Sequence, residues 1–97
     1  FLFMQAIAEE AEAMGFSPEQ ARQLVQQTAL GAAAMVEQNP ELALQTLREQ
    51  VTSKGGTTAE AIKTFQQQGL MPLTAQAMQA AVARATEMET LFSQEPR

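Results

Sequence analysis

Residues 28–35 constrain the fold most strongly, because this segment of the 97-residue chain has no polar face over two helical turns. It lies in a predicted helix with Ser17 as N-cap, Pro18 as the first helical residue and Gln20 as partner of the cap. The helix is predicted to end near Gln38. A helix that is apolar on every side must be buried on every side. A chain this short has too few other helices for that, so we expect a second copy to pack against it. The alternative is the core helix of a monomeric bundle.

Four further helices are predicted, and no stretch alternates with the period of two that a strand requires. They are expected at residues 1–14, 41–50, 58–68 and 73–92. Gly15 is predicted to end the helix at residues 1–14, and Asn39 with Pro40 is predicted to begin the helix at residues 41–50. Residues 93–97 are expected to fray. The chain is therefore predicted to be all-α, a five-helix, bundle-like single domain spanning residues 1–97.

Composition limits both the core and the chemistry. No cysteine or histidine is present, which removes disulfides, imidazole catalysis and the usual zinc sites, so no metal site is predicted. A net charge of −5 without a basic stripe argues against nucleic acid or an anionic membrane surface as partner. No apolar run approaches the roughly 18 residues of a membrane span. With 5 Phe and no Trp or Tyr the core must be aliphatic, which again favours help from a partner subunit.

The segment 51–62, VTSKGGTTAEAI, combines glycines, hydroxyls and a helix start. Gly55 and Gly56 allow positive φ and close approach of another group. Thr57 and Glu60 have the spacing of a capping box, which would occupy the Thr57 hydroxyl and leave that of Thr58 free. The amides of the first helical turn suit a carboxylate or phosphate. Without further context, the simplest interpretation is a well-capped turn between two helices.

The run 51–58, followed by Ala61 and Ile62 and preceded by Leu47, resembles the signature of the pyrroline-5-carboxylate reductases. Segments 14–15, 18–21, 30–32 and 88–89 are also similar to that family. The resemblance covers essentially the whole chain, but only the C-terminal helical dimerisation domain of the family, which has the 6-phosphogluconate dehydrogenase C-terminal-domain fold. The family's N-terminal Rossmann domain is absent from this sequence. The uncapped start at Phe1, without an initiator Met, agrees with a cut end of a longer chain.

The resemblance implies the last step of proline biosynthesis, in which NADPH or NADH reduces 1-pyrroline-5-carboxylate to L-proline. The cofactor would be bound mainly by the missing domain, so no cofactor-binding residue is assigned here and the isolated domain is expected to be inactive. The family also implies a cytoplasmic enzyme and an intertwined homodimer, with rings of dimers as a further level of assembly.

The resemblance assigns site residues in one loop only. The substrate carboxylate would be held by the Ser53 hydroxyl and by the amides of Gly55, Gly56 and Thr57. Thr58 would be the catalytic residue, facing the ring nitrogen, while the Thr57 hydroxyl would be structural. Lys54 stands where many members of the family have proline, which leaves the turn less rigid.

Two other functions stay open from the sequence. One is a purely structural dimerisation bundle whose loop binds nothing. The other is the helical domain of a related β-hydroxyacid-type dehydrogenase, which usually places a lysine on a helix as the acid. Neither Lys54 nor Lys63 lies in an apolar context typical of such a cleft.

Overall fold

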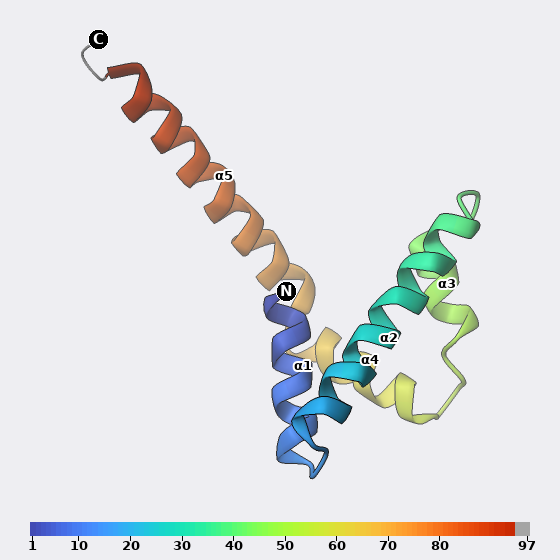
Figure 1. Cartoon of the computed structure of the whole chain (residues 1–97). Coiled ribbons are helices and arrows are strands. Elements are labelled where there is room, and N and C mark those ends of the chain that lie inside the picture. Colours follow the sequence, from blue (N-terminus) through green and yellow to red (C-terminus); the bar gives the residue numbers. More distant parts are fainter. Residues whose placement is uncertain (95–97) are drawn as a thin grey trace. The chain divides into compact units, whose positions relative to one another are not determined.

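The computed structural model describes residues 1–94, which form five helices and no strand (Figure 1). They are α1 (Leu2–Ala13), α2 (Pro18–Gln38), α3 (Leu44–Gln50), α4 (Thr57–Gln67) and α5 (Leu70–Gln94). The all-α prediction is therefore confirmed. The chain divides into two units, Phe1–Val51 with the first three helices and Thr52–Arg97 with the last two.

In the first unit, α1 and α2 form a helical hairpin whose turn follows the predicted signals. Gly15 has a φ of 112°, the left-handed region that favours glycine. The Phe16 N–H then donates to the Ala11 carbonyl at 3.1 Å, which satisfies the end of α1. Ser17 caps α2 as predicted: its hydroxyl accepts from the Gln20 N–H at 3.1 Å, and its own N–H donates to Gln20 Oε1 at 3.0 Å.

The predicted start of the third helix is wrong. Asn39 does not open α3 but ends α2, where its side-chain amide donates to the Met35 carbonyl at 2.8 Å. The Asn39 carbonyl accepts from the Leu42 N–H at 3.1 Å, which closes a turn. Helix α3 begins only at Leu44, with Ala43 as its N-cap. The predicted helix over 41–50 is therefore shortened, because Asn39 serves the helix before it.

A single copy of the chain has very little core. Among the described residues, the only buried apolar side chains are Ala21, Val25 and Leu47, all in the first unit. Residues 28–35 of α2, predicted to be buried on all sides, are all exposed in one copy except Ala29, which is half-buried.

In the second unit, α4 turns into α5 at Gly69, whose φ is 86°. Helix α5 starts three residues earlier than predicted, with Pro72 inside its first turn, where the missing N–H would have had no helical partner. Ser93 and Gln94 are helical, so they do not fray as predicted. Residues 95–97, the rest of that predicted frayed end, lie outside the described part.

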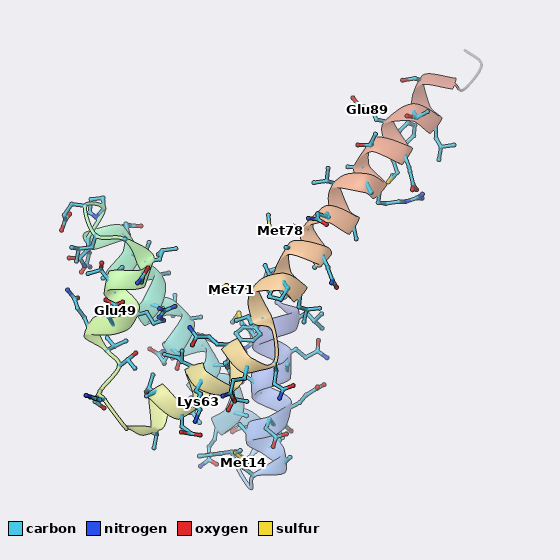
Figure 2. The ribbon with its side chains drawn as sticks, turned by 180° about the vertical axis from the view of Figure 1, so that it is seen from behind. Met14, Glu49, Lys63, Met71, Met78 and Glu89 are labelled. Atoms are coloured by element: carbon cyan, nitrogen blue, oxygen red, sulfur yellow. The ribbon has the colours of Figure 1, made fainter. Side chains whose placement is uncertain are left out.

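The side chains of α5 are exposed from Met71 to Ser93. Figure 2 shows them standing out along the helix, with Met71, Met78 and Glu89 labelled. Large apolar side chains are included, for example Leu73 at 62% and Val82 at 66% exposure. Over the described residues, no helix has the combined length and apolar character needed to cross a membrane.

Candidate functional site

Residues 52–58, which comprise the loop before α4 and the first two residues of that helix, belong to the second unit and include every site residue predicted from the sequence. Gly55 has a φ of 74°, so the chain here takes a conformation that other L residues rarely adopt. The Gly56 N–H donates to the Ser53 carbonyl at 3.1 Å, which closes a turn. The loop is thereby folded back onto the start of α4.

The predicted capping box at this site is wrong. Gly56, not Thr57, is the N-cap of α4, and no side chain caps the helix. Gly56 has the extended conformation that an N-cap needs, with φ −85° and ψ −179°, and its carbonyl accepts from the Glu60 N–H at 3.2 Å. Thr57 and Thr58 are therefore the first two helical residues. The Thr57 hydroxyl therefore does not cap α4, contrary to the prediction.

Three hydroxyls of this loop have no hydrogen-bond partner within the described residues: those of Ser53, Thr57 and Thr58. Threonines further along the helices behave differently. Thr64, for example, donates to the Glu60 carbonyl at 3.1 Å, and Thr74 donates to the Leu70 carbonyl at 2.7 Å. Thr57 and Thr58 have no helical carbonyl four residues before them, and both are exposed. Their hydroxyls are therefore available to a ligand.

The free amides match the predicted set, those of Gly55, Gly56 and Thr57, only in part. The Gly56 N–H is used inside the loop, whereas the N–H groups of Thr57, Thr58 and Ala59 have no carbonyl partner in the described chain. The sequence did not predict the free amides of Thr58 and Ala59, and glycine in the N-cap position was the signal that could have located them. Together with the positive end of the α4 dipole, these donors suit an anion.

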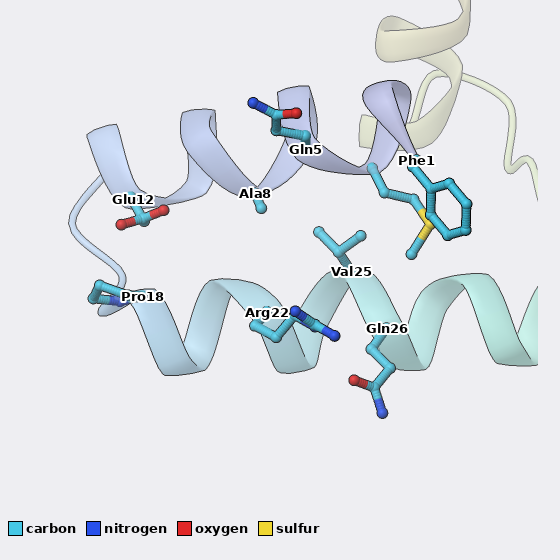
Figure 3. Close-up of a pocket in the computed structure, with 9 residues that line it drawn as sticks. Phe1, Gln5, Ala8, Glu12, Pro18, Arg22, Val25 and Gln26 are labelled. Carbon is cyan, nitrogen blue, oxygen red and sulfur yellow. The ribbon is translucent and has the colours of Figure 1, made fainter.

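The first unit has hollows beside the α1–α2 hairpin. Figure 3 shows one of them, where Ala8 and Val25 face each other between the helices and Glu12 and Arg22 lie at its rim. Another hollow is almost entirely apolar. It is lined by Phe3, Met4, Ile7, Ala11, Leu24, Val25, Thr28, Ala29 and Ala32. None of the predicted site residues lines these two hollows.

Within the described chain, no group of three or more carboxylate, histidine or cysteine side chains could hold a metal ion. The chemistry that the loop offers is therefore that of neutral hydroxyl and amide donors around a helix start. Such donors bind and orient an anionic group, and a hydroxyl can hold a proton near a basic atom. Lys54 adds an exposed cation to the same loop.

Comparison with known proteins gives a consistent result. Residues 1–88 match the model of the family described as pyrroline-5-carboxylate reductase dimerisation. The chain belongs to this family. It is 66% identical over 92 residues to the pyrroline-5-carboxylate reductase of Vibrio alginolyticus and 54% identical over 92 residues to that of Pasteurella multocida. A reductase of Pseudomonas aeruginosa is 45% identical over 94 residues.

These alignments cover 95%, 95% and 97% of this chain but 34% of each relative, so the chain spans about a third of their length. The resemblance read from residues 51–58 is thus confirmed at the level of the family. The helical architecture also agrees with a reductase dimerisation domain.

Proposed function

We propose that this chain is the C-terminal dimerisation and substrate-binding domain of a pyrroline-5-carboxylate reductase. The complete enzyme would reduce 1-pyrroline-5-carboxylate to L-proline with a nicotinamide cofactor, NADPH or NADH. The match of residues 1–88 to the family carries this proposal, because it includes the whole loop before α4. The described residues lack the strand, glycine-rich turn and helix that bind a dinucleotide, so no cofactor contact is assigned to them. A cytoplasmic location stays a prediction.

The substrate carboxylate would bind at the start of α4. The Ser53 hydroxyl and the amides of Gly55 and Thr57 would donate to its oxygens, and the Thr58 amide lies in the same turn. Gly56 would contribute through its backbone shape, because its own N–H is already bonded to the Ser53 carbonyl. Hydrogen bonds to an ionised carboxylate are roughly twice as strong as neutral ones, so a few such donors suffice to orient the ring.

Thr58 would be the catalytic residue, with its hydroxyl donating to the ring nitrogen of the imine. A hydrogen bond donated to the lone pair of the imine nitrogen places the ring and polarises the C=N bond toward addition of hydride at carbon. The unpartnered Thr58 hydroxyl supports this role. The Thr57 hydroxyl is equally unpartnered, so the choice of Thr58 rests on the family resemblance.

The enzyme would be a homodimer in which residues 28–36 of α2 and the α5 helices of two copies pack together. The support is the small number of buried side chains and the exposure of large apolar side chains on both helices, for example Leu30 on α2 and Val82 on α5. Rings of dimers are a further proposal, for which the chain provides no separate observation.

The proposal is tested by a matched pair of variants in the complete reductase, Thr58→Ala and Thr64→Ala. Both remove a threonine hydroxyl from α4, but the Thr64 hydroxyl already donates to the Glu60 carbonyl. Thr58→Ala should lower kcat/KM for pyrroline-5-carboxylate roughly 3- to 10-fold or more, since one hydrogen bond is worth about 0.5–1.5 kcal/mol and can strengthen in the transition state.

Thr64→Ala should leave kcat/KM nearly unchanged. If both variants had the same kcat/KM as the unmutated enzyme, Thr58 would have no catalytic role. A wild-type enzyme that reduces no pyrroline-5-carboxylate would favour a purely structural module. A lysine-dependent dehydrogenase is disfavoured by the exposure of Lys63 on α4.

A further inference from the structure

Gly56 and Ser53 are packed against each other in the loop before α4. A Cβ added to Gly56 would overlap the Ser53 hydroxyl oxygen, and it would lie 3.3 Å from the Ser53 carbonyl oxygen and 3.6 Å from the Ser53 Cβ. The carbonyl of Ser53 also accepts the Gly56 N–H at 3.1 Å, which fixes the two backbones relative to each other. The space over the Gly56 Cα is therefore filled by the Ser53 side chain.

The backbone conformation of Gly56 does not require glycine. Its φ of −85° and ψ of −179° are open to any L residue. Gly55 is the opposite case, because its φ is 74° while a Cβ there would meet nothing within 4 Å. The two neighbouring glycines thus meet different requirements: conformation at Gly55, and space at Gly56.

We propose that Gly56 is a positioning residue, which by lacking a Cβ keeps the Ser53 hydroxyl against the first turn of α4. This inference rests on the proposed role of Ser53 in binding the substrate carboxylate. The Ser53 hydroxyl moves by rotation about one bond, so an alanine at position 56 would drive it into another staggered rotamer. The loop would keep its fold while the hydroxyl left the carboxylate site.

The test compares three variants of the complete reductase: Ser53→Ala, Gly56→Ala and the double variant. KM and kcat for pyrroline-5-carboxylate are measured at saturating NADPH, with thermal unfolding recorded for each. Ser53→Ala should raise KM about 10- to 100-fold, as expected for a lost hydrogen bond to a charged group. Gly56→Ala should raise KM by a similar factor with little change in kcat, and the double variant should be no worse than Ser53→Ala alone.

A control separates this effect from a general loss of stability. Gly15 has a φ of 112° and lies in the turn between α1 and α2, outside the loop. Gly15→Ala should lower the melting temperature because of backbone strain and leave KM unchanged. A Gly15→Ala enzyme with a raised KM would mean that instability alone explains the kinetics, and the inference would be lost.

Each outcome for the loop variants is decisive. Effects of Ser53→Ala and Gly56→Ala that multiply in the double variant would show independent roles and overturn the inference. A harmful Ser53→Ala with a silent Gly56→Ala would overturn the inference and leave the proposed function standing. A silent Ser53→Ala would refute the carboxylate role of Ser53, and the inference with it. If Gly56→Ala fails to fold, recovery of folding in the double variant supports the steric coupling, and no recovery refutes it.

Discussion

A charge placed in the middle of α2 should break the proposed dimer. Ala33 lies in the apolar segment of α2 and is exposed in a single copy, so Ala33→Glu is harmless to an isolated chain apart from its small effect on helix propensity. In a dimer packed along residues 28–36, the same carboxylate would be buried without a partner. The substitution therefore distinguishes a covered surface from a solvated one.

The magnitude follows from the symmetry of the interface. Leaving one charge buried and unpaired costs at least about 3 kcal/mol, and a twofold dimer contains the substitution twice. Each substituted copy thus raises the dissociation constant of the dimer by roughly two orders of magnitude, and the two copies together raise it by roughly four. A dimer with a nanomolar dissociation constant would then dissociate at micromolar concentration. Since one copy has so small a core, dissociation should be accompanied by loss of helical structure or by aggregation.

Sedimentation velocity and far-UV circular dichroism at micromolar concentration measure both effects. Gln23→Glu is the matched control, because it adds the same charge to an exposed position of the same helix outside residues 28–36. The control should remain dimeric. The reasoning would be refuted if the unmutated protein were a stable, folded monomer. It would also be refuted if the Ala33→Glu variant dimerised as well as the Gln23→Glu variant.

Two further predictions concern the cap of α2 and the isolated chain. Ser17→Ala removes the hydroxyl that accepts the Gln20 N–H, so it should cost about 1 kcal/mol of stability, seen as a lower melting temperature. Unchanged melting would mean that the cap contributes nothing measurable. The purified 97-residue chain should not oxidise NADPH in the presence of pyrroline-5-carboxylate, because its described residues contain no dinucleotide-binding unit. Turnover that copurifies with the chain would contradict this expectation.

The sequence was informative where one residue type has a single structural meaning. Gly15 and Gly69 mark helix ends, and both adopt the positive φ that few other residues tolerate. Ser17, Pro18 and Gln20 together are typical of a helix start, and the reciprocal hydrogen bonds of the capping box are present. At these positions the local chemistry alone determines the backbone, so the sequence is sufficient to predict it.

The sequence failed where a residue can serve two neighbouring elements. Asn39 is suited both to starting one helix and to ending another, and its hydrogen bond to the Met35 carbonyl shows that it ends α2. Thr57 has the spacing of a cap with Glu60, yet Gly56 takes the capping position because its extended backbone already accepts the Glu60 N–H. Choosing between such alternatives depends on turn geometry that residue type does not encode.

The candidate site was predicted in part for the same reason. The loop could be located from its glycines and hydroxyls, but the one-residue shift in the start of α4 changes which amides are free. The contact between Ser53 and Gly56 was also beyond the sequence, because a glycine in a loop is usually explained by its conformation. Only the three-dimensional structure shows that Gly56 is required for space, whereas Gly55 is required for its positive φ.

The most direct test of the account is a crystal structure of the complete reductase with L-proline bound. The account predicts the proline carboxylate at the start of α4, with its oxygens within about 3.2 Å of the Ser53 hydroxyl and of at least one amide of Thr57 or Thr58. The ring nitrogen should lie within the same distance of the Thr58 hydroxyl. A carboxylate bound away from this loop, with these donors facing solvent, would contradict the central claim.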